Sequence, residues 1–312
     1  MPPSLHARLI KRWEIAYRFG KQPRLWRASP VKWALACHEM FETGRIDLLE
    51  YAARRLHKAY PELDYLTKMV AWFDAIPRHL PPPLVFTDSP AAEVQIVHRA
   101  GSDAVLLCFC AQEGTLGLPL NFVHQWLGRL PVSLVYIKDL QDTSGALGFP
   151  SIASSRSQSI AALRAIAEDL GGKRIYTLGV SAGGYAAMYY GLHVNALAVL
   201  NLAGATDLTR DFVERLNPVP AVCFRVLDMA PDYAVSLREP YAAAKQRPHL
   251  LIAFNAKFAR DRAQAERMAG LPNVELIAVD GAPQHNVVDP LIRAGQFLDL
   301  LHRLLAANPA EA

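Results

Sequence analysis

A serine between glycines, at the spacing G-x-S-x-G, is the pattern in this sequence with the clearest chemical meaning. It reads GVSAGG at residues 179–184, after an apolar run and before an alanine-rich stretch. Glycines permit a sharp, strained turn from strand to helix, where side chains at positions 179 and 183 would collide with neighbouring elements. The helix N-terminus and the Ala182 N–H would favour an oxyanion. The pattern predicts a nucleophile, Ser181, and the alternative is a glycine-rich turn with a passive serine.

Apolar, β-rich runs alternate with helical ones between residues 84 and 306, and these elements must position the serine. Strands are predicted at 84–87, 93–97, 104–110, 132–137, 174–180, 196–202, 249–254 and 274–279. Helices are predicted at 121–130, 157–170, 182–192, 258–269 and 287–306, with an irregular, proline-punctuated region before residue 249. This alternation predicts an α/β fold with a mostly parallel sheet, helices on both faces, and the functional groups beyond the carboxyl ends of the strands.

The stretch from residue 81 to residue 306 resembles the α/β-hydrolase family, and GVSAGG is its most specific element. The resemblance covers about three-quarters of the chain. It implies the α/β-hydrolase fold, a nucleophile elbow at Ser181, and an acid followed by a histidine later in the chain.

The resemblance implies that the general base is a histidine in a loop before the last long helix, and His285 is in that place. Three other histidines follow Ser181. His193 ends the helix after the elbow, His249 opens a strand, and His302 falls on the outer part of the final helix. Structural roles explain those three, so His285 is the predicted base.

The triad acid is left open among three aspartates. Asp261 follows the strand 249–254 after a short loop, the position from which the family's acid reaches its histidine. The alternative is that the carboxylate of Asp261 stabilises a helix N-terminus or forms a surface ion pair. Asp228 follows a β-like run, and Asp280 is close to the histidine in sequence. Asp261 is preferred, and its role would be to hold the imidazole tautomer and stabilise the imidazolium.

A second oxyanion donor is expected just after the strand 104–110. Many α/β-hydrolases have His-Gly there, whereas this chain has Cys110 and Ala111. The backbone N–H of Gln112 is the first choice and that of Ala111 the second, each acting together with the N–H of Ala182.

Cofactor and metal motifs are not found in the sequence. The segment HEMFE at residues 38–42 has glutamate where a zinc-binding helix needs its second histidine, and LGGKR at 170–174 lacks the other residues of a P-loop. No G-x-G-x-x-G occurs. The cysteines form no C-x-x-C pair and are interpreted as small buried hydrophobes in a reducing compartment: Cys37, Cys108, Cys110 and Cys223. We expect neither a cofactor nor a metal.

Residues 1–78 are predicted to form a helical appendage, and residues 81–312 an α/β-hydrolase catalytic domain. Helical patterns cover 5–19, 31–43 and 46–60, and prolines at 77 and 81–83 mark the boundary. The stretch 34–61 faintly resembles one tetratricopeptide-type unit. One such unit cannot build a repeat array, so these helices are expected to form a cap or a homo-oligomer contact.

Charge is unevenly distributed along the chain. Residues 1–80 contain 14 Lys and Arg against 8 Asp and Glu, which leaves 19 against 21 for the remainder. No run of five like charges occurs, so a solvated helical face is expected and no nucleic-acid partner. The longest apolar stretch, 104–111, is too short to span a bilayer, and the N-terminus has no apolar signal region. A soluble, cytoplasmic protein is the expectation.

The chemistry implied by these residues is that of a serine hydrolase. Ser181 would attack a carboxylic ester or thioester, on a small molecule or linked to a glycan, and form an acyl-enzyme that water releases. Two alternatives stay open. An acyltransferase would use the same triad with a sugar or other alcohol in place of water, and a non-catalytic scaffold would keep only the fold.

Overall fold

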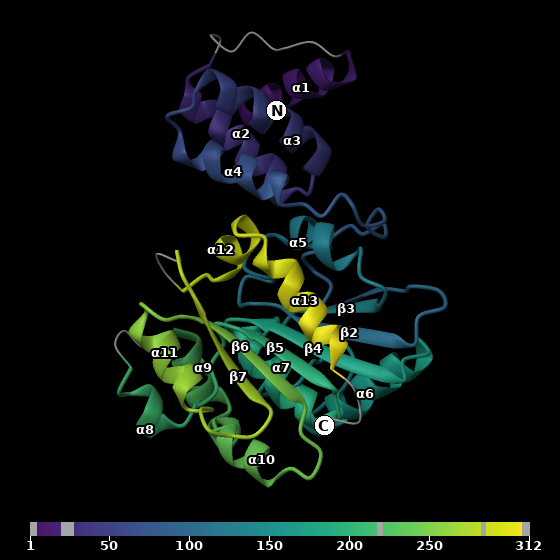
Figure 1. Cartoon of the computed structure of the whole chain (residues 1–312), viewed down its shortest axis with the longest axis vertical. Coiled ribbons are helices and arrows are strands. Elements are labelled where there is room, and N and C mark those ends of the chain that lie inside the picture. Colours follow the sequence, from purple (N-terminus) through teal and green to yellow (C-terminus); the bar gives the residue numbers. More distant parts are fainter. Residues whose placement is uncertain (1–4, 20–27, 217–220, 282–284, 308–312) are drawn as a thin grey trace.

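The computed structural model describes residues 5–19, 28–216, 221–281 and 285–307. Within these ranges, seven strands form one sheet in the order β1-β3-β2-β4-β5-β6-β7 (Figure 1). β1 is antiparallel to β3, and the remaining neighbours are parallel. The strands are β1 (Val94–Val97), β2 (Ala104–Phe109), β3 (Ser133–Ile137), β4 (Arg174–Val180), β5 (Ala198–Leu202), β6 (His249–Asn255) and β7 (Val274–Val279). The predicted α/β fold with a mostly parallel sheet is confirmed.

Helices cover both faces of the sheet. One face carries α5 (Leu120–Leu127), α12 (Val288–Arg293) and α13 (Gln296–Ala306). The other face carries α6 (Arg156–Asp169), α7 (Ala182–His193), α8 (Arg210–Val213), α9 (Ala221–Met229), α10 (Arg238–Ala243) and α11 (Ala259–Glu266). No helix in the described ranges has the length and apolar character needed to cross a membrane.

Strand β2 shows why its apolar run forms a central strand. All six of its residues are buried, and they alternate between the two cores. Leu106 and Cys108 pack under α5 and α13, whereas Val105, Leu107 and Phe109 pack under α6 and α7. Successive side chains of a strand point to opposite faces, so a strand covered on both faces needs an unbroken apolar sequence.

Four helices precede the sheet and lie at one end of the molecule, above α5 and α12 (Figure 1). They are α1 (Leu5–Arg18), α2 (Pro30–Glu42), α3 (Ile46–Ala59) and α4 (Asp64–Asp74), and we call them the helical segment. Phe122 of α5 meets Phe41 and Phe73 at ring-centroid distances of 5.1 and 5.4 Å. The apolar core of the helical segment is therefore continuous with the core on the α5 face of the sheet. The domain boundary near residue 80 and self-association through these helices stay predictions.

Three expected elements differ from the structure. Residues 84–87 form no strand: Val85 is 95% exposed, and Leu84 donates its N–H to the carbonyl of Gly128, outside the sheet. The predicted helix 287–306 is divided into α12 and α13 at Gly295, whose φ of 72° is left-handed. The region before β6, expected to be irregular, contains short helices. Within the predicted helical appendage, α4 is a fourth helix whose range was not predicted separately.

Candidate active site

The turn from β4 into α7 holds Ser181 in a strained conformation, with φ 54° and ψ −118°. A Cβ added at Gly183 would lie 2.2 Å from the carbonyl oxygen of Phe109, and one at Gly179 would lie 2.1 Å from that of Gly183. Real Cβ atoms do not approach so closely. The expected collisions at positions 179 and 183 are confirmed, and the glycines allow the serine to stand at the carboxyl edge of the sheet.

Ser181, His285 and Asp261 form one hydrogen-bonded chain. Nε2 of His285 is 2.7 Å from Oγ of Ser181, and Nδ1 of His285 is 2.8 Å from Oδ1 of Asp261. Because an ionised carboxylate only accepts, Nδ1 carries the proton that faces Asp261, and in the neutral ring Nε2 accepts from the serine hydroxyl. This tautomer is the one a general base for Ser181 needs.

Asp261 occupies the first turn of α11, after β6, and its side chain is only 2% exposed. Its Oδ2 has no hydrogen-bond partner among the described residues. The structure brings this aspartate to His285 and leaves the other two elsewhere. Asp228 is on the exposed face of helix α9, so the β-like run expected before it is helical, and Asp280 is exposed directly after β7.

Ala111 and Gln112, the two candidates for the second oxyanion donor, differ in the hydrogen bonding of their backbone N–H groups. Ala111 donates its N–H to the carbonyl of Thr115 at 2.7 Å, which engages it within its own loop. The Gln112 N–H has no acceptor among the described residues, and the Ala182 N–H is in the first turn of α7, where no intrahelical acceptor exists. Gln112 and Ala182 line the same pocket as Ser181, whereas Ala111 does not.

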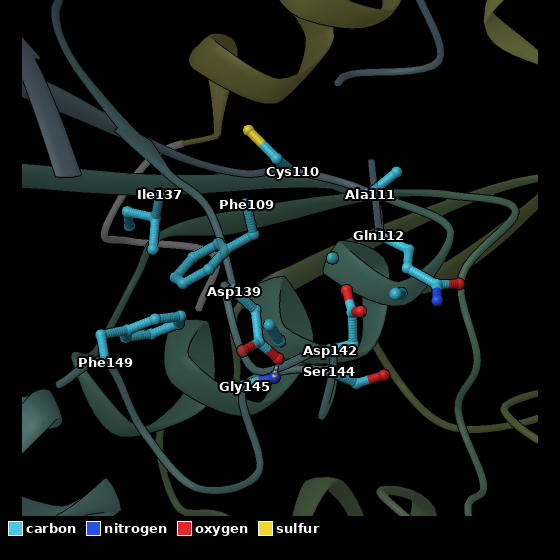
Figure 2. A pocket seen from close by; sticks show the side chains of 13 residues that line it. Phe109, Cys110, Ala111, Gln112, Ile137, Asp139, Asp142, Ser144, Gly145 and Phe149 are labelled. Atoms are coloured by element: carbon cyan, nitrogen blue, oxygen red, sulfur yellow. Dashed lines mark hydrogen bonds between the residues drawn. The ribbon is translucent and has the colours of Figure 1, made fainter. Parts of the chain in front are cut away.

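A loop after β3, missed in the sequence, forms part of the pocket wall. Asp139 accepts hydrogen bonds from the N–H groups of Gln141, Thr143 and Gly145 and from the Thr143 hydroxyl. These bonds hold Asp142 and Ser144, each with a left-handed φ of 55°. Figure 2 shows Asp139, Asp142 and Ser144 below Gln112, around a narrow crevice. An aspartate followed by small polar residues at a strand end was the available signal.

The pocket at Ser181 has a volume of about 210 Å³. It meets the crevice of Figure 2 at Gln112, Ser144 and Ala182, which line both. Its other walls are mostly apolar: Ala203, Ala205, Leu208, Leu216 and Cys223, together with Arg260 and Gln264. The hydrogen-bonded chain thus faces a cavity large enough for a small organic group.

Asn286, the residue after His285, links the histidine loop to the loop that carries Gln112. Its Nδ2 donates to the carbonyl of Gly117 at 2.8 Å, and its Oδ1 accepts from the N–H of Val288 at 2.9 Å. A Cβ at Gly117 would lie 2.8 Å from Val288, so this approach requires glycine. These hydrogen bonds of Asn286 therefore hold the loop of His285 against the loop that follows Gln112.

The helical segment reaches the same region through Trp72. Nε1 of Trp72 donates to Oδ1 of Asp289 at 2.6 Å, and Arg293 forms two further hydrogen bonds to that carboxylate at 2.8 and 3.0 Å. Partial burial raises the pKa of Asp289, but the hydrogen bonds from Arg293 and Trp72 outweigh it, so the net pKa is lowered. Asp289 stays ionised at the start of α12, four residues after His285.

Neither the cysteines nor a metal cluster offers a competing chemistry in the described part of the chain. Burial raises the pKa of Cys110 to about 12 and that of Cys223 to about 11, so both thiols stay protonated and are poor nucleophiles. Among the described residues, no group of three His, Cys, Asp or Glu side chains could hold a metal ion.

The sheet order, with an antiparallel first strand, and the serine on the turn after β4 together define the α/β-hydrolase fold, as the resemblance implied. No family model matches the sequence, and no curated protein matches it. Among solved structures, the chain is similar to an esterase B from Lactobacillus rhamnosis, with 12% identity, a TM-score of 0.49, and coverage of 83% of this chain and 96% of the other.

Two further solved structures are similar to the chain at comparably low sequence identity. An esterase from Pyrococcus furiosus has 15% identity and a TM-score of 0.43, with 72% of this chain and 98% of that chain covered. The capsule O-acetyltransferase of Neisseria meningitidis serogroup A, solved in complex with CoA, has 12% identity and a TM-score of 0.46, with 68% and 91% covered. Strand order and elbow geometry in this chain, and not these likenesses, define the fold.

Proposed function

We propose that the protein is a serine hydrolase that cleaves a carboxylic ester or thioester through an acyl-enzyme. One observation carries the proposal: Ser181, His285 and Asp261 are joined by hydrogen bonds of 2.7 and 2.8 Å at the mouth of a pocket. A serine hydroxyl is a weak nucleophile at its free pKa, and a histidine within hydrogen-bond reach activates it.

The proposed first half-reaction starts when Oγ of Ser181 attacks the carbonyl carbon and its proton passes to Nε2 of His285. The carbonyl π electrons move to oxygen, where the N–H groups of Gln112 and Ala182 would stabilise the negative charge. Asp261 stabilises the imidazolium without taking its proton. When the tetrahedral intermediate collapses, the bond to the leaving oxygen or sulfur breaks, and His285 gives that atom the proton.

The second half-reaction restores the enzyme. His285 removes a proton from water as the water oxygen attacks the acyl carbon, and the collapse of the second intermediate returns a proton to Oγ of Ser181. The acid is released. Alkoxide and thiolate leaving groups need less protonation than an amine, which favours esters and thioesters over amides as substrates.

The pocket bounds the substrate in size. Its volume of about 210 Å³ is below the roughly 300–1,000 Å³ of pockets that bind drug-sized ligands. We therefore propose a small-molecule ester, or an acyl group on a glycan whose sugar stays outside the pocket.

A fluorophosphonate probe tests the proposal because it forms a covalent bond with activated serines. We expect the full-length protein to gain one probe by intact mass, and the Ser181→Ala and His285→Ala variants to gain none. Ser144→Ala is the matched control, since this second serine lines the pocket without contacting His285. Folded wild-type protein that stays unlabelled would show that the proposal is wrong.

A further inference from the structure

We propose that the alcohol half of the substrate is an uncharged, hydroxyl-rich group of the size of a sugar, and that it binds in a second cavity beside Gln112. This inference rests on the proposed function, because it assigns a substrate class to the same ester-cleaving site. The cavity has a volume of about 470 Å³, within the roughly 300–1,000 Å³ of pockets that bind small molecules. We call it the polar cavity.

The polar cavity lies between two loops that follow parallel strands. Residues 112–115, after β2, line one side, and Asp139 and Asp142, after β3, line the other (Figure 2). Glu42, the last residue of α2, adds a wall from the helical segment, which lies above α5 in Figure 1. Ligands of α/β sheets bind beyond the carboxyl ends of the strands, and the polar cavity occupies that place.

Gln112 connects the polar cavity to the nucleophile. It lines both this cavity and the pocket that contains Ser181 and His285. Its backbone N–H is the candidate oxyanion donor. An ester whose carbonyl oxygen lies at this N–H therefore has the polar cavity within reach of one of its two halves.

The two cavities differ in the polarity of their walls, which assigns the two halves of the ester. The pocket at Ser181 has mostly apolar walls, such as Leu208 and Leu216. The acidic residues of the polar cavity come from four separate segments: Glu42, Asp88, Glu113, Asp139 and Asp142. A hydroxyl placed against apolar walls loses its hydrogen bonds to water without replacement, which is unfavourable. The acyl chain therefore belongs in the pocket at Ser181, and the hydroxyl-bearing half in the polar cavity.

Three side chains on the loop after β2 are available to bind hydroxyls. Within the described ranges, no hydrogen bond or ion pair engages the side chains of Gln112, Glu113 or Thr115. Gln112 and Glu113 are exposed, and Thr115 is partly buried. A carboxylate accepts hydrogen bonds, whereas an amide and a hydroxyl both donate and accept. Sugar hydroxyls also donate and accept, so they match this set.

The cations at the polar cavity are already engaged, which argues against an anionic group. Lys138 is the one Lys or Arg among the described residues that line it. Its side chain is only 4% exposed, and its Nζ lies 2.6 Å from Oδ1 of Asp88 and 2.9 Å from the carbonyl oxygen of Ser89. Asp142 is paired with Arg225 at 3.3 Å. A phosphate or carboxylate would have to displace one of these pairs, and a neutral alcohol would not.

Acetate esters of matched size test this inference in the full-length protein. The 6-O-acetyl methyl hexopyranosides of the gluco, galacto and manno series carry hydroxyls, and cyclohexylmethyl acetate has a six-membered ring without them. Acetylcholine and acetylglycerol phosphate place a cation and an anion on the alcohol side. Acid release gives kcat/KM, which is divided by each ester's rate of alkaline hydrolysis to remove its intrinsic reactivity. We expect at least one hexopyranoside to exceed cyclohexylmethyl acetate by about tenfold, the usual effect of a hydrogen bond to a charged group.

Two variants remove the proposed hydrogen-bonding groups one at a time. In Glu113→Ala, we expect the ratio of kcat/KM for the preferred hexopyranoside to that for cyclohexylmethyl acetate to fall about tenfold. Thr115→Val keeps the size of the side chain and removes only its hydroxyl, so the ratio should fall about fivefold. Glu168→Ala is the matched control: this glutamate is exposed on α6, across the sheet from α5, and the ratio should stay at the wild-type value.

Three results would overturn the inference. In the first, no hexopyranoside exceeds cyclohexylmethyl acetate. In the second, acetylcholine or acetylglycerol phosphate exceeds every hexopyranoside, which would assign a charged alcohol. In the third, Glu113→Ala and Thr115→Val both leave the ratio unchanged, so that any loss of activity reflects support of the Gln112 loop.

Failure of the proposed function is recognised separately, because fluorophosphonate labelling of Ser181 requires no group in the polar cavity. A labelled protein without preference for a hexopyranoside refutes only the substrate class.

Discussion

On the elbow side of Ser181, backbone atoms leave no room for side chains, whereas on the histidine side the geometry depends on hydrogen bonds between residues far apart in sequence. A Cβ at Gly183 would lie 2.2 Å from a carbonyl oxygen of β2. His285, by contrast, is linked to Asp261, 24 positions away, and its neighbour Asn286 is linked to Gly117, 169 positions away. The steric constraint requires glycines at fixed positions, which gives a short recognisable motif. Hydrogen bonds between residues far apart in sequence give no such motif.

The largest effect is expected from Gly183→Ala, which adds a side chain in the turn that carries Ser181. The added Cβ would meet the carbonyl oxygens of Phe109 and Cys110, so the backbone must shift and stability should fall by about 3 kcal/mol or more. Chemical denaturation and fluorophosphonate labelling measure the change. Gly270→Ala is the control, since no atom lies within 4 Å of its added Cβ and only its left-handed φ is penalised, at about 1–2 kcal/mol. Equal losses in both variants would contradict the steric account.

The second largest effect is expected from Asp261→Asn, which changes the hydrogen-bond partner of His285. An amide in place of the carboxylate presents a donor to Nδ1 and favours the wrong tautomer, so we expect kcat for an activated ester to fall by roughly 10⁴-fold with the fold intact. Circular dichroism checks the fold. Asp228→Asn is the control and should keep full activity, because Asp228 is exposed on α9. A decrease in Asp228→Asn equal to that in Asp261→Asn would refute the assignment of the acid.

A smaller effect is expected from Asn286→Asp, which keeps the acceptor for the Val288 N–H and removes the donor to the Gly117 carbonyl. Loss of one hydrogen bond, about 1 kcal/mol, should lower kcat about fivefold with KM nearly unchanged, because the two loops lose their register while the pocket remains. Steady-state kinetics separate the two parameters. A higher KM at unchanged kcat would instead place Asn286 in substrate binding.

The smallest effect concerns pH and Asp289. Its pKa is lowered in the folded protein, so its charge contributes stability above the ordinary aspartate value of 3.8 and loses that contribution as pH falls through the lowered folded value. Wild type should exceed Asp289→Asn by about 1 kcal/mol or less near neutral pH, and the difference should shrink toward pH 3. Thermal melts across this range measure it. A difference that grows as pH falls would contradict the assigned direction.

The sequence was most informative where local chemistry decides the structure. The elbow glycines and the apolar strand before Ser181 are readable along the chain, whereas the order of acid and histidine was implied by the family resemblance and the acid was left open among three aspartates. In the structure His285 is hydrogen-bonded to Ser181 and to Asp261. The hydrogen bond from the Ala111 N–H to the carbonyl of Thr115 could not be predicted, because only the folded loop brings these two groups together.

Three other features of the structure could not be predicted from sequence patterns, each for a physical reason. The bond from Trp72 to Asp289 joins residues 217 positions apart, and nothing local marks either partner. Residues 84–87 have strand-like composition, but the backbone of Leu84 is engaged at α5: its N–H donates to the carbonyl of Gly128, and its carbonyl contacts Nε2 of His124. The run before Asp228 is apolar because one helical face is buried, which a short window cannot distinguish from a strand.

We expect the helical segment and the sheet to unfold as a single cooperative unit, because their apolar core is continuous. Phe41, Trp72 and Phe73 all pack on Phe122, so separating the helices from the sheet would expose this aromatic cluster to water. Amide hydrogens in α4 and in α5 should then exchange through the same opening event, and cleavage near residue 80 should not release an active fragment.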